Sequence, residues 1–455
     1  MMMNDKLRNM ITEVRNKVRD HGIKASIHYH HENSHLMRIG NNSVSLNTSE
    51  ELTRIDIEVI ENRKKGTHTH LGEIGSADDL FKMILMVSEK AGKSAEMDFE
   101  PVLTVIEANV ETETQYDAAL DNLDPSVKER VYSAIFKNVG ENYNYSGSWS
   151  SGSTETFSVT TANNNSVWHR LTDQQFTCVL KHPEKMWELA SWQTGWKAGD
   201  VTAEATINEF KSILPVYENH DGFKVEPGSY RVVFGSQSLG DLLGMTVWTG
   251  CAGRTWEMKM GWTADRKIGD DVLHPSVTVL DDPENGQIFS EPLSDSGMLT
   301  KTQAMIEKGK FAGLLYDRNT ASKYGKEATP SAGCLAMQPG EGSVDFLEAV
   351  KDFERVLYIP AIHYMNMPNM SKGIFTGSSR FSAVLVEKGK IVSPIFSSRI
   401  TDQFENIFGK VLAISSETIS VNTSNTYGRR APSAVSVPTW MLVDDVKITD
   451  CAESF

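Results

Sequence analysis

The histidines near the N-terminus have the spacing of a metal-dependent hydrolase. His31-Glu32-Asn33-Ser34-His35 matches the HExxH pattern, in which two histidines bind zinc and the glutamate acts as a general base. That chemistry requires a helix, because only there can both imidazoles reach one metal ion at about 2.0–2.1 Å. The flanking residues alternate as in a strand, which would hold the two α carbons roughly 13 Å apart. The histidines could meet only if residues 32–34 form a hairpin loop, and we expect a polar hairpin end instead of a functional zinc site.

Two further histidine pairs have the HxH spacing of metal ligands on a strand. His68 and His70 follow Gly66 at an expected strand edge, and His28 and His30 share one face of another strand. Histidines at a protein surface explain both pairs better than a metal does. We therefore predict no metal site in this chain from its histidines.

Composition and charge describe a globular chain without affinity for nucleic acid. The 455 residues are 40% hydrophobic and 23% charged, which suits two or three domains. Because 60 acidic residues outnumber 45 basic ones, the net charge is −15, whereas nucleic-acid-binding surfaces are basic. The compact basic clusters are Arg63-Lys64-Lys65 and Arg429-Arg430, and we expect both to be solvated loop charge.

The apolar runs and the cysteines give expectations about membrane insertion and the cellular compartment. No apolar run approaches the ~20 residues that a membrane span needs, and no secretory signal is readable, so we expect no membrane partner. The four cysteines are widely scattered and predict free thiols in a reducing cytoplasm; they are Cys178, Cys251, Cys334 and Cys451.

The hydrophobic pattern predicts an α+β protein of three domains. Residues 1–95 are expected to form an N-terminal domain in which an antiparallel sheet packs with helices. Residues 96–222 are expected to form a central α/β domain. Residues 223–455 are rich in short alternating strands, which predicts a β-rich domain shaped as a half-open barrel or a sandwich.

Local signals refine this outline. The apolar stripe of residues 7–18 predicts a helix, and Asn41-Asn42 predicts a turn between strands. Ser76 and Asp79 have the spacing of a capping box at the start of a second helix. The Ser, Gly and Asn residues of 144–153 predict a loop, and residues 236–243 predict a short helix.

One succession of segments in the C-terminal half identifies a family. Pro227-Gly228 leads into the strand-like residues 230–234 and the helix-like residues 236–243, followed by Gly244-Met245-Thr246-Val247-Trp248-Thr249. Further on, residues 313–321 read Gly-Leu-Leu-Tyr-Asp-Arg-Asn-Thr-Ala. This succession resembles the TldD/PmbA family, whose members were once labelled modulators of DNA gyrase.

The resemblance implies a metalloprotease frame without its metal ligands. The active branch of the family carries His-Glu-x-x-x-His here, with a later cysteine completing a zinc site. In this chain Gly244 and Thr249 replace the histidines, Met245 replaces the glutamate, and Tyr427 stands where the cysteine would be. The chain therefore resembles the PmbA (TldE) branch. This implies a non-catalytic subunit of a cytoplasmic protease acting on unfolded or modified peptides, with zinc in a TldD-type partner.

The resemblance also implies a second group of site residues. Asp317, Arg318 and Thr320 belong to the family's Leu-x-Asp-x-x-Thr-Ala pattern near the central cavity, so they are candidates for a peptide channel. A buried ion pair or a strand cap explains them at least as well.

Three readings of the function stay open at this point. In the first reading the chain is a non-catalytic subunit of a heterodimer or homodimer. In the second it is a stand-alone zinc metallopeptidase using His31, Glu32 and His35, and in the third it is a self-associating regulatory or binding protein. Whether the chain alone is an enzyme is not decided by its sequence.

Overall fold

The computed structural model describes residues 5–331, 333–424 and 429–455, and within them the strands form three sheets. With 24% helix and 41% strand, the predicted α+β class is confirmed. None of the sheets in these ranges closes into a barrel.

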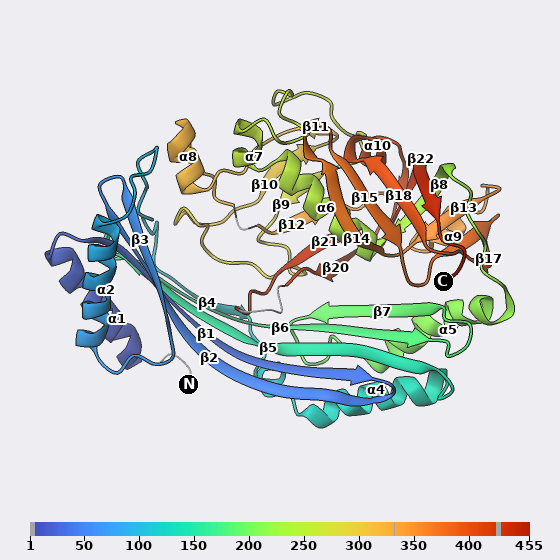
Figure 1. The fold of residues 1–455 in the computed structure, drawn as a ribbon, viewed down its shortest axis with the longest axis horizontal. Helices are drawn as coiled ribbons and strands as arrows, with labels where there is room; N and C mark the ends of the chain where they lie inside the picture. The colour runs from blue at the N-terminus through green and yellow to red at the C-terminus, as the bar shows by residue number, and fades with distance from the viewer. Residues whose placement is uncertain (1–4, 332, 425–428) are drawn as a thin grey trace.

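The first sheet is the long curved layer along the bottom of Figure 1. Its strands follow the order β3-β2-β1-β5-β6-β4, and β7 also pairs with β6. The predicted turn at Asn41-Asn42 joins β1 to β2, and both residues have positive φ angles. The strands of this sheet are β1 (Lys24–Gly40), β2 (Ser43–Glu61), β3 (Lys64–Leu71), β4 (Val110–Gln115), β5 (Asn144–Thr160), β6 (Ser166–Lys181) and β7 (Glu188–Gly195).

Helices cover one face of the first sheet. The apolar sides of α1 and α2 pack on Ile27 and Tyr29 of β1, which confirms the helix predicted over residues 7–18. The Ser76 hydroxyl accepts a hydrogen bond from the Asp79 N–H, so the predicted cap of α2 is also confirmed. The helices of this half are α1 (Asp5–Asp20), α2 (Ala77–Gly92), α3 (Ala118–Asp121), α4 (Pro125–Val139) and α5 (Ala203–Asn219).

The loop predicted over residues 144–153 is wrong, because these residues begin the long strand β5. Their small side chains allow neighbouring strands to approach closely. A Cβ atom on Gly147 would lie 2.2 Å from the Thr177 carbonyl oxygen, and one on Gly152 would lie 1.9 Å from the Asn33 carbonyl oxygen. The glycines that look like loop residues in the sequence are therefore requirements of strand packing.

The other two sheets lie above the first sheet in Figure 1 and share a large apolar core. One has the order β11-β10-β9-β12-β21-β20, and the other has the order β14-β15-β18-β22-β8-β13-β16-β17, with β19 on β22. Their strands are β8 (Gly228–Gly235), β9 (Val279–Asp281), β10 (Gln303–Glu307), β11 (Lys310–Phe311), β12 (Leu335–Met337), β13 (Val356–Ile359), β14 (Ile362–Asn369), β15 (Ile374–Ser379), β16 (Val384–Glu387), β17 (Lys390–Pro394), β18 (Ser398–Gln403), β19 (Val411–Ile414), β20 (Thr418–Asn422), β21 (Ala434–Pro438) and β22 (Trp440–Cys451).

The helix predicted over residues 236–243 is too short, because α6 (Ser236–Gly250) continues through the next seven residues. Leu239, Leu242, Leu243 and Val247 hold one side of it in the core. The remaining helical segments of this half are α7 (Gly253–Glu257), α8 (Arg318–Tyr324), α9 (Phe346–Ala349), the 3₁₀ turn η1 (Met370–Lys372) and α10 (Phe404–Gly409).

The expected domain boundaries at 95 and 222 remain predictions. The first sheet contains strands from both sides of residue 95, and one apolar cluster joins Trp149 of β5 to Val233 of β8 and Trp440 of β22. Among the described helices, none combines the length and apolar character that crossing a membrane would require.

Candidate functional site

Helix α6 carries three of the four positions that replace the zinc motif. Gly244 faces open space, since a Cβ atom there would meet nothing within 4 Å. Met245 packs against the C-terminal core. Thr249 is buried, and its hydroxyl donates to the Met245 carbonyl oxygen at 2.7 Å. These three side chains offer no metal ligand and no general base, so the residues present here do not fit a zinc ion.

The fourth position, Tyr427, lies outside the described residues. The two arginines that follow it are described, and both lie against the polar face of the first sheet. The expectation that Arg429 and Arg430 are solvated loop charge is wrong, because Arg430 is only 8% exposed and both side chains are held by acidic partners.

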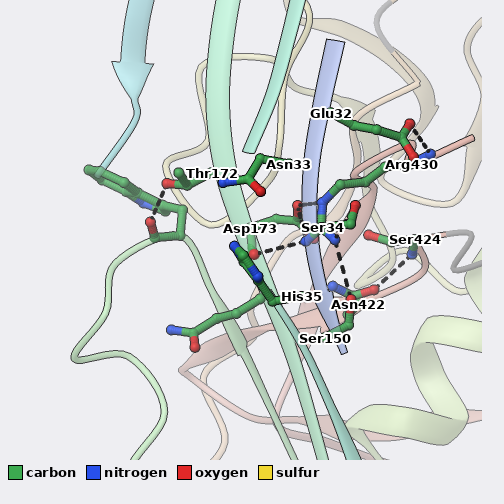
Figure 2. Close-up of polar contacts among 12 residues, drawn as sticks. Glu32, Asn33, Ser34, His35, Ser150, Thr172, Asp173, Asn422, Ser424 and Arg430 are labelled. Carbon is green, nitrogen blue, oxygen red and sulfur yellow. Dashed lines mark hydrogen bonds and ion pairs between the residues drawn. The ribbon is translucent and has the colours of Figure 1, made fainter. Parts of the chain in front are cut away.

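Arg430 is the centre of the polar cluster in Figure 2. Its guanidinium lies 2.7 Å from Asp173 Oδ1 on β6 and also donates to the hydroxyls of Ser34 and Ser150. Its main-chain N–H donates to Glu32 Oε2 at 2.9 Å. A charged pair of this kind, almost closed to water, holds its geometry firmly because each partner would be costly to leave unpaired.

Arg429 makes a second set of contacts on the same face. Its guanidinium donates to His28 Nε2 at 2.6 Å, His30 Nδ1 at 3.2 Å and Asp56 Oδ2 at 3.0 Å. Burial, and then the Arg429 charge, lower the pKa of His28 to about 3, and burial also lowers the pKa of His30. The prediction of a surface histidine is therefore wrong for His30, which is buried, whereas His28 is partly exposed. Both side chains accept a hydrogen bond from Arg429.

The HExxH segment has the extended geometry that excludes a zincin site. Residues His31–His35 lie in the middle of β1, paired on both sides with β2 and β5, so the expected hairpin end is also wrong. His31 contacts Thr53 Oγ1 and His35 contacts Ser49 Oγ on the neighbouring strand β2. Glu32 points to the opposite face from both histidines because side chains alternate along a strand. In residues 5–331, 333–424 and 429–455, no three His, Cys, Asp or Glu side chains are grouped to hold a metal ion.

His68 and His70 lie on β3, the terminal strand of the first sheet, where a strand edge was predicted. Both are partly exposed, and His70 Nε2 lies 3.3 Å from the Glu73 carbonyl oxygen.

Asp317, Arg318 and Thr320 form the start of α8. Although burial opposes ionisation, hydrogen bonds from Thr320 and from the N–H groups of Thr320 and Asn319 keep the pKa of Asp317 low. Asp317 thus caps the helix. Arg318 pairs with Glu58 of β2 at 3.0 Å and also contacts Thr104. The expected strand cap is therefore wrong, because Asp317 caps a helix, and the expected ion pair is present with both side chains partly buried.

The cavities between the first sheet and the C-terminal half include two near the residues discussed above. One of about 540 Å³ is lined by Arg318, His28, Ser158 and the loop at Ser294. The other, of about 610 Å³, lies between β7, α5, the first turn of α6 and β20. Its lining is rich in amides and aromatic rings and includes Gln175, Trp192, Trp196, Glu209, Gln287 and Asn422.

Glu209 in the larger cavity is a residue that the sequence did not point to. Desolvation of its carboxyl group raises the pKa of Glu209 to about 7. In the sequence it is one polar residue of an amphipathic helix, and in the structure it is one of that helix's exposed residues, with its carboxyl group at the cavity. Arg430 did leave a signal, since it lies three residues after Tyr427, the position where the resemblance places the family's cysteine.

Comparison with known proteins agrees with this geometry. Residues 227–450 match the model of the PmbA/TldA metallopeptidase C-terminal domain. A metalloprotease of Methanothermobacter thermautotrophicus is 24% identical over 157 residues, which make up 31% of this chain and 34% of that protein. The match thus spans about a third of the curated relative's length.

Solved structures share the fold over almost the whole chain. TldE from Thermococcus kodakarensis has a TM-score of 0.81 at 14% identity, covering 97% of this chain and 100% of that one. A protein of Bacteroides thetaiotaomicron described as a candidate modulator of DNA gyrase has a TM-score of 0.82 at 14% identity, covering 98% and 100%. A protein of Thermotoga maritima with the same description has a TM-score of 0.78 at 17% identity, covering 97% and 100%.

The fold and the matched C-terminal half define a metallopeptidase-related protein. The chain belongs to the PmbA/TldD family.

Proposed function

We propose that this chain is the non-catalytic, TldE-type subunit of a metalloprotease that acts on unfolded or modified peptides. The proposal rests on the side chains of α6 at the three positions that replace the zinc motif. Gly244 has no side chain, Met245 is part of the core, and the Thr249 hydroxyl is bound to its own helix. A zinc ion and its chemistry would belong to a TldD-type partner that carries His-Glu-x-x-x-His.

The larger cavity supports a role in holding peptide. Strand β20 pairs with β21 and with no other strand in the described part of the chain, and Thr418, Ile419 and Ser420 line the cavity. An unpaired strand edge binds an extended peptide through main-chain hydrogen bonds, with little sequence preference. In this proposal Arg318 shapes the neighbouring cavity and keeps β2 joined to α8, as part of the peptide channel with Asp317 and Thr320.

The proposed setting is the cytoplasm. All four cysteines are buried, and Cys178, Cys251 and Cys451 are free thiols, as expected of a chain that works in a reducing compartment.

The direct test measures metal content and peptide hydrolysis of the purified chain, alone and mixed with a TldD-type chain. We expect no stoichiometric zinc and no cleavage from the chain alone, and cleavage from the mixture. Stoichiometric zinc together with chelator-sensitive cleavage by the chain alone would refute the proposal.

The two alternatives give different results. A stand-alone peptidase would lose activity in Glu32→Gln, but His31 and His35 lie on an extended strand and cannot share a metal. A self-associating regulatory protein would form a stable oligomer that a TldD-type chain does not dissociate, and light scattering on the mixture measures this.

A further inference from the structure

The larger cavity, of about 610 Å³, is lined by acidic and aromatic side chains. Among the described residues of its lining, the acids are Asp200 in the loop after β7 and Glu209 on α5, and neither lysine nor arginine takes part. The rings of Trp192 and Trp196 also line it. The ammonium group of Lys197 lies 4.5 Å from the centre of the Trp196 ring, so one of these rings already attracts a cation of the chain itself.

A chain of hydrogen bonds ends on the carboxyl group of Glu209. Both main-chain groups of Thr202 hold the Gln193 amide in one orientation, and Gln193 Nε2 donates to Thr206 Oγ1 at 2.9 Å. The Thr206 hydroxyl is therefore left to donate to Ser191 Oγ, 3.0 Å away, and the Ser191 hydroxyl donates to Glu209. Because every member donates toward the carboxyl group, the chain fixes Glu209 as an acceptor and favours its ionised form.

The ionised carboxyl group of Glu209 has acidic groups around it. Water reaches the side chain, but the surrounding protein raises its pKa to about 7 by desolvation, against the hydrogen bond from Ser191, which lowers it. The neighbours that respond to its charge are the phenol of Tyr358 and the thiol of Cys178, which are acids themselves. A positive group from a ligand would stabilise the carboxylate, because an opposite charge nearby favours the ionised form.

The open edge of β20 runs along the same cavity. At the end of this strand the Thr423 N–H donates to the Ser433 carbonyl oxygen on the β21 side, at 2.8 Å. Because the bonds of an antiparallel pair alternate, the main-chain groups of Thr418, Ser420 and Asn422 point away from β21. These three residues also line the cavity. A peptide paired with this edge would direct alternate side chains into the cavity, where they could be selected by their chemistry.

We propose that this cavity binds a lysine or arginine side chain of the peptide, so that the chain selects basic segments. The inference rests on the proposed function, which holds the peptide at β20. The Glu209 carboxylate receives the positive charge, and the Trp192 ring packs against the methylene stem. Asp200, whose carboxylate accepts hydrogen bonds from the N–H groups of Trp196 and Lys197, adds a second negative charge.

The test is calorimetric binding of five-residue peptides to the full chain at about pH 8, where Glu209 is mostly ionised. The peptides have blocked ends and alanine at each position except the central one, which is lysine, Nε-acetyl-lysine or glutamate. We expect the lysine peptide to bind at least about tenfold more tightly than the acetyl-lysine peptide, which keeps the stem and lacks the charge. The glutamate peptide should bind more weakly than both.

A pair of variants on α5 separates this site from the general attraction of an acidic chain for basic peptides. Glu209→Gln should remove the preference for lysine, because the amide can still accept from Ser191 but carries no charge. Glu204→Gln is the matched control. Glu204 is exposed on the same helix and lies outside the cavity lining, so this change removes the same charge and should leave the tenfold preference intact.

Equal binding of the lysine and acetyl-lysine peptides by the wild type overturns the proposal, and this comparison needs no variant to fold. A lysine preference that survives in folded Glu209→Gln overturns it as well. The proposed function fails separately. Cleavage by the mixture with a TldD-type chain, without any lysine preference, refutes only the basic-side-chain site, whereas a lysine preference without cleavage by the mixture refutes only the proposed subunit role.

Discussion

The main-chain N–H of Arg430 donates a hydrogen bond to Glu32 Oε2 at 2.9 Å, joining positions 398 residues apart in the sequence. The same carboxylate oxygen lies 2.8 Å from His30 Nε2. Glu32 therefore ties the segment after residue 428 to the first sheet. The glutamate of the HExxH pattern has a structural position here, buried and directed away from His31 and His35.

Glu32→Gln should lower stability without any catalytic effect. The amide oxygen can still accept from both Arg430 and His30, but the charge is lost and an NH2 group replaces the oxygen that lies 3.9 Å from Arg54 Nη2. A poorly satisfied buried group costs about 1–3 kcal/mol. Urea unfolding followed by circular dichroism measures the change. Glu51→Gln is the matched control, since Glu51 is on β2 with an exposed side chain and should cost at most ~1 kcal/mol. Equal effects of the two changes would contradict the structural role.

The Asp173–Arg430 pair should show strong coupling in a double-mutant cycle. Their charged atoms are 2.7 Å apart, with side chains 4% and 8% exposed. Removing one partner should cost about 3–5 kcal/mol, because the other is left without its partner in a site closed to water. Arg430→Met together with Asp173→Leu should cost less than the sum of the two single changes. The exposed pair Arg231–Asp444, 3.2 Å apart, is the control and should show coupling of at most ~1 kcal/mol.

Two glycines on α6 should respond oppositely to alanine. Gly244→Ala should stabilise the chain by about 0.5–1 kcal/mol, because the methyl group meets no atom within 4 Å and alanine is the better helix residue. Gly240→Ala should destabilise it, because the methyl group would lie 2.8 Å from Val421 Cγ1. Thermal unfolding measures both. Destabilisation by Gly244→Ala would show that the space beside it is not open.

Local periodicity and capping residues predicted much of the fold. The stripe of residues 7–18 and the Ser76–Asp79 cap depend on contacts within a few residues, which a sequence displays directly. The segment 144–153 was mistaken for a loop because its glycines are explained by strands far away in the sequence. Position 152 requires glycine because a Cβ atom there would overlap the carbonyl oxygen of Asn33 on the neighbouring strand.

The candidate site was only partly predictable for the same reason. The side chains that replace the zinc motif are visible in the sequence at positions 244, 245 and 249. The hydrogen bonds of His28 and His30 with Arg429 join positions about 400 residues apart, and no local pattern shows that contact. The alternation of β1 correctly placed the two histidines on one face, but it could not show what covers that face.

Lys128 gives the chain a titrating group inside its core. Its side chain is 2% exposed, and its ammonium group donates to the carbonyl oxygens of His35 and Trp149 at 3.3 and 3.2 Å. Burial, with a smaller effect of the Arg430 charge, lowers the pKa of Lys128 to about 7. In the unfolded chain the same lysine titrates at about 10.4.

The stability of the chain should therefore rise with pH between about 7 and 10.4 through Lys128. In this window the unfolded state binds a proton that the folded state has released, so the free energy of unfolding increases with pH, by at most ~1.4 kcal/mol per unit. Lys128→Met removes the contribution, so the difference between wild type and variant should move in favour of the wild type as pH increases. Urea unfolding at several pH values between 7 and 9.5 measures this change in the free energy of unfolding.

Lys137→Met is the control, because Lys137 is exposed on the same helix, α4, and its difference from wild type should not vary with pH. A Lys128→Met difference that is equally flat would mean that the buried ammonium group keeps its proton throughout this range.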